Sequence, residues 1–174
     1  MKKILLIGII IFSVANLSMA QKYAYVDTQY ILDNIPAYAE AQTKLDDYAV
    51  KWQQEIESKY NLISKKRIAL QAEEILLPEE IKNEKQANIL KLETEAKELQ
   101  KKYFGIDGML FEKRSELIKP IQDKIFEAIQ EISDEKKFAF VFDKANQSTL
   151  LFADPKYNIS DLVLRKMDIV VKDN

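Results

Sequence analysis

The side chains that most often carry out catalysis are scarce in this chain. Its 174 residues include no histidine and no cysteine, so the commonest general base and the commonest metal ligands are missing. The chain contains 3 glycines, and none lies in a glycine-rich loop that could cradle a phosphate. This composition predicts a protein that is not an enzyme and that needs no metal ion or other cofactor.

Paired carboxylates are the remaining candidates for acid–base chemistry. Glu73-Glu74 and Glu79-Glu80 are the clearest pairs. A glycosidase-like reaction would require two carboxylates that face each other across a cleft. Acidic and basic residues are interleaved along the surrounding sequence, which is typical of the solvated face of a coiled coil. We therefore interpret both pairs as solvated rather than catalytic.

Two long helices are predicted to position these residues. Apolar residues recur every three or four positions from Tyr38 to Lys136, which is the period of a helix face. Pro78 interrupts the pattern; proline suits the first turn of a helix, and Leu77 before it resists helical geometry. The pattern predicts an antiparallel helical hairpin over 38–116, with a first helix that ends at Leu77 and a tip near 75–80.

Each arm of this hairpin has an apolar seam. The first arm contributes Tyr38, Ala41, Leu45, Tyr48, Trp52, Ile56, Tyr60, Ile63, Leu70 and Leu77. The return arm contributes Ile89, Leu92, Ala96, Leu99, Tyr103, Ile106 and Leu110, and the pattern continues through Ile118, Ile121, Ile125, Ala128 and Ile132. Alternating spacings of three and four predict a left-handed coiled coil with one continuous return helix, bent at Pro120.

The segments outside the hairpin are predicted to form a small α+β body. Three of them are rich in aromatic and β-branched residues and are expected to be strands: Lys22–Asp27, Phe138–Phe142 and Thr149–Ala153. Short helices are expected at Gln29–Asn34, with Thr28 as N-cap, and at Asp161–Met167, capped by Asn158 or Ser160. Three short strands leave open edges and little core. We expect residues 21–37 and 117–174 to form a body that other copies of the chain complete, in a number that this reasoning does not fix.

Residues 1–20 have the pattern of a cleavable export signal. Lys2 and Lys3 precede the apolar run Ile4–Ala15, and Ser18-Met19-Ala20 offers small residues for cleavage before Gln21. The run is too short to span a bilayer, although an uncleaved anchor is the alternative. Export of a protein without cysteine indicates a bacterial envelope compartment.

The charge balance argues against nucleic acid as a partner. The full chain carries 28 acidic and 26 basic side chains, and its isoelectric point is near 5.4. Removal of the export segment takes away two further basic residues, Lys2 and Lys3. Nucleic-acid binding requires clustered lysine and arginine, so no such partner is expected.

Several apolar residues are candidates for binding other chains. Ile68, Phe104, Met109 and Phe111 lie off the seams and could be exposed, or they could widen the packed stripe. Ile75, Leu76 and Leu77 at the tip have few partner atoms, or they could form a local staple that closes the turn. Gly105 and Gly108 permit either a hinge or a close helix approach, and Pro120 is a second candidate flexible point.

Short segments in a fixed order resemble the Skp (OmpH-like) family of periplasmic chaperones. The segments are Tyr23-Ala24-Tyr25-Val26-Asp27, Leu76-Leu77-Pro78-Glu79, Phe104-Gly105 with Gly108, Pro120-Ile121-Gln122-Asp123-Lys124-Ile125, Phe140-Val141-Phe142-Asp143 and Ala153-Asp154-Pro155-Lys156-Tyr157. The resemblance covers essentially the whole chain after residue 20. It implies a homotrimer whose strands form a barrel-like body, from which three helical hairpins extend like tentacles around a cavity.

The resemblance also implies a function. Proteins of this kind hold unfolded outer-membrane proteins in the periplasm without ATP, and an exported coiled-coil spacer that docks one envelope partner is the alternative hypothesis. The best-known members are strongly basic and this chain is acidic. We therefore do not extend a lipopolysaccharide or phospholipid site to it.

Overall fold

The computed structural model describes residues 21–145 and 151–170, so the expected export segment 1–20 lies outside the described residues. The elements are β1 (Lys22–Val26), α2 (Thr28–Asp33), α3 (Pro36–Glu73), α4 (Glu79–Phe104), α5 (Met109–Lys136), β2 (Phe138–Asp143), the 3₁₀ turn η1 (Pro155–Tyr157) and α6 (Ser160–Lys166). The chain divides into two compact units. The hairpin unit is Ile35–Asp123, and the strand unit comprises the described residues 21–34, 124–145 and 151–170.

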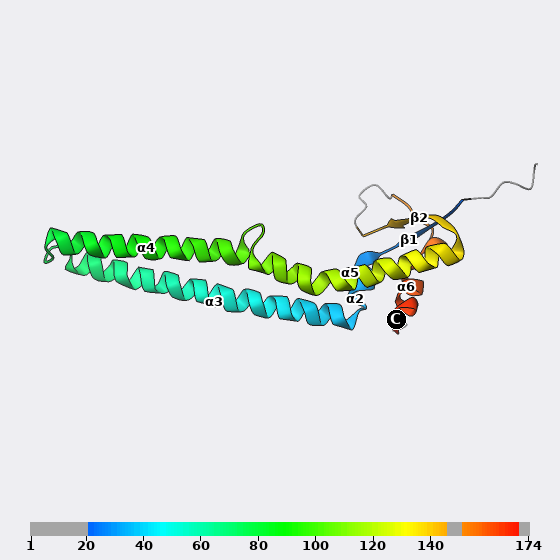
Figure 1. Cartoon of the computed structure of the whole chain (residues 1–174), viewed down its shortest axis with the longest axis horizontal. Helices are drawn as coiled ribbons and strands as arrows, with labels where there is room; N and C mark the ends of the chain where they lie inside the picture. Colours follow the sequence, from blue (N-terminus) through cyan, green and yellow to red (C-terminus); the bar gives the residue numbers. More distant parts are fainter. Residues whose placement is uncertain (1–20, 146–150, 171–174) are drawn as a thin grey trace, which may run out of the picture. The chain divides into compact units, whose positions relative to one another are not determined.

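The hairpin unit contains α3 and α4 side by side in opposite directions (Figure 1). Pro36 occupies the first turn of α3, where its missing N–H group costs no hydrogen bond. The buried residues of α3 all belong to the predicted seam: Ala41, Leu45, Trp52, Ile56, Ile63 and Leu70. Tyr48 and Tyr60, which the same pattern placed on the seam, are exposed instead.

The reversal begins earlier than the sequence pattern indicates. α3 ends at Glu73 rather than at Leu77, Pro78 takes the N-cap position, and α4 begins at Glu79. A further turn of α3 would have no return arm to pack against, so it would bury little apolar surface. Leu77 instead folds back onto a cluster in the hairpin core.

The return arm is two helices and not one. α4 ends at Phe104, and the four residues Gly105–Gly108 loop out before α5 begins at Met109 (Figure 1). Ile106, which the heptad pattern placed in the seam, is 93% exposed in this loop. Tyr103 and Leu110 still contact the same core cluster, so looping out keeps both helices in phase with α3.

Three apolar clusters hold the two arms together. Nearest the reversal are Ile63, Leu70, Ile89 and Ala96, with Leu77 and Leu92 packed against them. Next are Trp52, Ile56 and Tyr103, with Leu99, Met109 and Leu110. The third comprises Ala41, Leu45 and Ile118, with Tyr38, Leu110, Leu117 and Ile121. The hairpin is therefore packed along its length by large aliphatic and aromatic side chains from both arms.

The strand unit is built on β1 and β2, which pair in parallel from Tyr23–Phe140 to Val26–Asp143. The amide of Ile159 donates to the carbonyl of Tyr25 at 2.9 Å and ties the chain before α6 to this sheet. Its buried side chains are Ala24, Tyr25, Val26, Ile31, Ile125, Ala128, Ile132, Ile159, Ser160, Val163 and Leu164. Helix α5 supplies part of this core as well as part of the hairpin core.

Local details in the strand unit differ from the expected ones. Asp27, not Thr28, caps α2 by accepting the amide of Tyr30 at 3.1 Å. Ile159, and neither Asn158 nor Ser160, is the N-cap residue of α6, although the Oδ1 of Asn158 accepts the amide of Ser160 at 2.9 Å. Of the strand expected at Thr149–Ala153, the first two residues lie outside the described ones, and Leu151–Ala153 are in no strand. Among the described residues, no strand pairs with Leu151–Ala153, so these residues form no β-ladder.

Candidate functional site

The Glu73-Glu74 pair at the reversal forms ion pairs with lysines of α4, while Glu79 and Glu80 lie in the first turn of α4. Glu74 accepts Lys82 at 2.7 Å, and Glu73 pairs with Lys85. The hydrogen bond from Lys82 to Glu74 raises the pKa of the lysine above 10.5. Within the described part of the chain, no group of three or more acidic, histidine or cysteine side chains could hold a metal ion.

The turn between these ion pairs presents two bare aliphatic side chains. Ile75 is 97% exposed and Leu76 is 84% exposed, while the amide of Leu76 donates to the carbonyl of Glu73 at 2.8 Å. Both ion pairs join the end of α3 to the first turns of α4, so they hold the turn closed. The exposed pair is therefore presented on a closed turn, where it is free to contact another molecule.

Leu77, the third apolar residue predicted to be exposed at the tip, is not fully exposed. It is only partly exposed and packs against the cluster of Ile63, Leu70, Ile89 and Ala96. The proline that follows directs the chain back into α4, which places the Leu77 side chain over the core. It acts as the local staple that was the alternative interpretation of this segment.

The apolar residues off the seams differ in exposure. Ile68 is 64% exposed and Phe111 is 56% exposed, so both offer free surface. Phe104 is 36% exposed and meets the ring of Trp52 edge-on, with centroids 6.5 Å apart. Met109 does not offer the free surface considered for it from the sequence, because it is partly buried against the cluster of Trp52, Ile56 and Tyr103.

The two glycines of the return arm lie in a tight loop and not inside a helix. A Cβ atom on Gly105 would lie 2.4 Å from the carbonyl oxygen of Lys101, and one on Gly108 would lie 2.8 Å from the Gly105 nitrogen. Both positions therefore require glycine for close backbone approach. Pro120 lies within α5, which continues through it. A hinge role for these residues stays a prediction.

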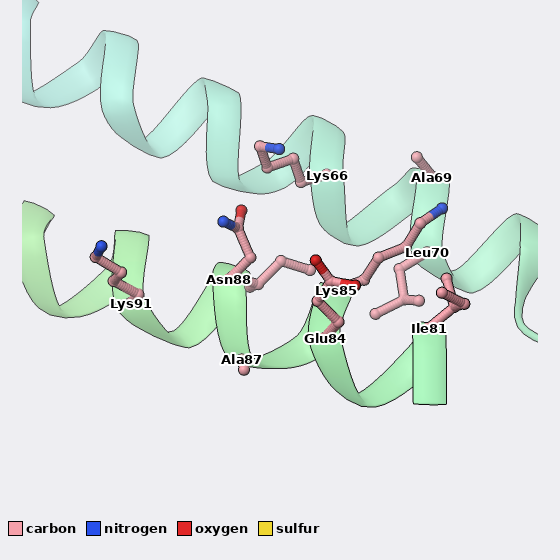
Figure 2. A pocket seen from close by; sticks show the side chains of 10 residues that line it. Lys66, Ala69, Leu70, Ile81, Glu84, Lys85, Ala87, Asn88 and Lys91 are labelled. Carbon is pink, nitrogen blue, oxygen red and sulfur yellow. The ribbon is translucent and has the colours of Figure 1, made fainter. Parts of the chain in front are cut away.

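A groove near the reversal was not predicted from the sequence. It lies between α3 and α4 and has a volume of about 620 Å³ (Figure 2). Its lining residues are Lys66, Ala69, Leu70, Ile81, Glu84, Lys85, Ala87, Asn88, Ile89 and Lys91. The alanines at 69 and 87 were a usable signal, because short side chains beside a seam leave space that long ones would fill.

The comparisons with known proteins decide the family. The family described as outer membrane protein (OmpH-like) matches residues 22–167. This chain belongs to the OmpH-like family. An uncharacterized protein of Aquifex aeolicus (strain VF5) is 29% identical over 155 residues, which are 89% of this chain and 91% of that protein.

A solved structure has the same fold. The OmpH-like chain superposes on a crystal structure of a candidate outer membrane chaperone (OmpH-like) from Caulobacter crescentus CB15 with a TM-score of 0.68. The sequences are 11% identical, and the match covers 88% of this chain and 90% of the other. Among residues 21–145 and 151–170, no helix of this OmpH-like protein has the length and apolar composition needed to cross a bilayer.

The OmpH-like chain also exposes a row of aromatic rings on its strand unit, which was not singled out from the sequence. Tyr23 stacks on Phe140 with centroids 6.0 Å apart, and Phe140 stacks on Phe142 at 6.3 Å. All three rings are exposed, as are Leu151 (96%) and Phe152 (82%). A short sheet with open edges and bare aromatic side chains is suited to bind further strands.

Proposed function

We propose that this OmpH-like protein is an ATP-independent holdase of the bacterial periplasm, which binds unfolded outer-membrane proteins and prevents their aggregation. Membership of the family supports the proposal, together with the expected export signal at residues 1–20. The observation that carries it furthest is the closed turn with Ile75 and Leu76 almost fully exposed. Two adjacent exposed aliphatic side chains offer apolar surface that an unfolded client would bury.

The chemistry of such binding requires no catalytic group. Burial of apolar surface contributes about 25 cal/mol per Å² whatever the sequence of the bound chain. Several small apolar contacts, such as Ile68, Ile75, Leu76 and Phe111, would therefore retain clients of varied sequence while each contact exchanges quickly. Phe104 offers a smaller contact of the same kind, since part of its ring lies against Trp52.

We propose further that the chain acts as a homotrimer. The exposed row of Tyr23, Phe140 and Phe142 and the bare Leu151 and Phe152 support assembly through the strand unit. In this arrangement strands from each subunit complete the sheet, and the hairpins enclose the client. The acidic charge of the chain argues against an additional role at anionic lipid.

An aggregation assay tests the proposed function. A urea-unfolded β-barrel outer-membrane protein is diluted into buffer with and without the mature chain, which is residues 21–174. Light scattering is then followed. Suppression that grows with chaperone concentration, for several unrelated clients, is the expected result. If every client aggregated as fast with the chain as without it, the holdase proposal would be wrong.

A second function is an exported coiled-coil spacer that docks one fixed envelope partner. The burial of most seam residues in the hairpin favours it, because a spacer needs a packed arm and little free apolar surface. The same assay separates the two. A spacer would leave unfolded clients to aggregate and would bind one folded partner.

A further inference from the structure

The loop between α4 and α5 is closed by hydrogen bonds and presents one bare aliphatic side chain. The amide of Gly108 donates to the carbonyl of Gly105 at 2.9 Å, so Ile106 and Asp107 are the corners of a four-residue turn. The amide of Gly105 donates to the carbonyl of Lys101 at 2.8 Å, which ties this turn to the end of α4. Ile106 is 93% exposed, and the loop stands out on the side of α4 that faces away from α3 (Figure 1).

The turn at the reversal has the same construction. The amide of Leu76 donates to the carbonyl of Glu73 at 2.8 Å, and Ile75, which is 97% exposed, is one of its corners. Both turns belong to the hairpin unit, and α4 joins them. This helix has 26 residues and therefore spans about 39 Å at 1.5 Å per residue. The hairpin unit thus presents two bare isoleucines that are held apart by the full length of α4.

Neither turn alone offers enough surface to hold a folded partner. Stable interfaces between folded proteins bury about 800 Å² on each partner, whereas each turn presents only one or two bare aliphatic side chains. The charges beside the loop are of both signs, since Lys101 and Lys102 precede it and Asp107 and Glu112 follow Ile106. Such a mixture favours neither an acidic nor a basic partner. An unfolded chain differs from a folded partner because it can reach both turns at once.

The spacing of the two turns suits an unfolded β-barrel protein. An extended chain advances about 3.3 Å per residue, so about 12 residues reach from one turn to the other. Membrane β-barrels consist of segments of about ten residues in which apolar and polar side chains alternate, and turns separate these segments. Two neighbouring segments of one unfolded client can therefore occupy the two turns together.

We propose that Ile106 is a client-binding residue, and that its loop and the turn at the reversal together retain one unfolded chain; this inference rests on the proposed holdase function. One apolar segment of the client would contact Ile75 and Leu76, and a second would contact Ile106. Each contact is weak by itself. Binding at one turn holds the second segment near the other turn at an effective concentration of roughly 1 mM, which raises the overall affinity. The preferred clients are chains with two apolar segments at least about 12 residues apart.

Fluorescence anisotropy with labelled peptides tests the role of Ile106. Each peptide has two identical clusters of leucine and phenylalanine, joined by a glycine–serine spacer of about 6 or about 24 residues, and only the longer spacer can span α4. The long-spacer peptide is expected to bind the mature chain roughly three- to tenfold more tightly than the short-spacer peptide. Ile106→Ser is expected to abolish this difference, while the affinity for the short-spacer peptide changes by no more than about twofold.

Val50→Ser is the matched control, because Val50 is an aliphatic side chain of α3 that is 56% exposed and lies outside both turns. This variant is expected to keep the difference between the two peptides. Equal affinities of the two peptides for the unmodified chain would overturn the proposal, as would a difference that persists in Ile106→Ser or disappears equally in Val50→Ser. Light scattering should give the same mass for Ile106→Ser as for the unmodified chain. A lower mass would assign Ile106 to a contact between copies of the chain instead.

The aggregation assay separates this inference from the function on which it rests. If the role of Ile106 alone is wrong, the unmodified chain still suppresses aggregation and the effect of the spacer does not depend on Ile106. If the holdase function is wrong, the unmodified chain fails to suppress aggregation of any client, whatever the peptide affinities are. Circular dichroism of each variant confirms that the helices are retained.

Discussion

Ile75 and Leu76 are among the most exposed apolar residues in the described part of the chain. They lie in the turn between two ion pairs, and their side chains contact almost nothing in the chain. We predict that Ile75→Ser/Leu76→Ser weakens suppression of client aggregation, because it removes apolar surface that clients would bury. The free energy of unfolding should change by less than about 0.5 kcal/mol, since no packed contact is lost.

Leu70→Ala is the control for Ile75→Ser/Leu76→Ser, because it truncates a buried leucine close to the same turn. Leu70 is 8% exposed, so this change should lower the free energy of unfolding by about 2–5 kcal/mol. Urea unfolding followed by circular dichroism measures both variants. A large loss of stability in the serine variant, or unchanged suppression of aggregation, would contradict the role given to the turn.

Lys166 gives the strand unit a pH-dependent contact. Its Nζ atom lies 2.8 Å from Glu131 and 2.9 Å from Glu135, joining α6 to α5. The hydrogen bond from Lys166 lowers the pKa of Glu135 below 4.5, and the carboxylates raise the pKa of Lys166 above 10.5. A carboxyl group whose pKa falls on folding stabilises the fold at pH values above its ordinary pKa of 4.5. A lysine whose pKa rises on folding stabilises the fold at pH values below its ordinary pKa of 10.5.

We therefore predict that Lys166→Met is less stable than the unmodified chain at neutral pH. The difference should shrink as the pH falls below 4.5, where Glu135 becomes protonated, and as it rises above 10.5. Urea unfolding across this pH range measures the difference. Lys124→Met, at an exposed lysine without an ion pair, should show no such dependence. A constant difference at every pH would refute an ionic contribution.

The loop between α4 and α5 is the element that sets the return arm apart from a plain coiled coil. A Cβ atom at Gly105 would overlap the carbonyl oxygen of Lys101 at 2.4 Å. We predict that Gly105→Ala/Gly108→Ala lowers the free energy of unfolding by about 1–3 kcal/mol, because the backbone must shift to relieve the overlap. Asp107→Ala in the same exposed loop should have almost no effect.

Urea unfolding, with the single tryptophan Trp52 as a fluorescent probe of the adjacent cluster, measures these variants. If both glycines were a hinge only, the double alanine variant would be as stable as the unmodified chain and would differ only in the range of client sizes that it protects. That result would contradict the close-packing explanation of the loop.

The arms could be predicted from the sequence because their seams follow a simple period. Residues such as Ala41, Ile56 and Ile89 are buried where the spacing of three and four places them. The loop could not be predicted in the same way, since Tyr103 and Leu110 are seven apart and the heptad runs through it unbroken. Ile106 fits that heptad by type, yet it lies in the loop, where Gly105 and Gly108 weaken the helix and allow the close backbone approach that the loop requires.

The surfaces were harder to predict than the core. Periodicity identifies which residues pack, and it correctly set Ile68 and Phe111 apart from the seam. It could not distinguish Met109, which packs, from Phe111, which does not, because their difference depends on how α5 restarts after the loop. The groove between α3 and α4 depends in the same way on side-chain length at neighbouring positions of two helices.

The complete protein is expected to assemble through the strand unit. We predict that light scattering of the mature chain gives the mass of a trimer. Burial of the exposed rings of Phe140 and Phe142 between subunits would drive the association, and the number three is what the family resemblance implies. Phe140→Ser/Phe142→Ser should shift the mass toward that of one chain. Phe111→Ser, at an exposed ring of the hairpin unit, is the control and should leave the trimer intact. A monomeric unmodified chain would contradict the prediction.

A holdase should bind the unfolded state of a client and leave its folded state unbound. The same β-barrel outer-membrane protein is labelled and offered to the mature chain either diluted from urea or already folded in detergent, with matched detergent in both arms. We predict saturable binding of the unfolded form and no binding of the folded form. Equal binding of both forms would show no preference for unfolded chains, and binding of the folded form alone would show that the chain docks a defined partner. Either result would contradict the holdase function.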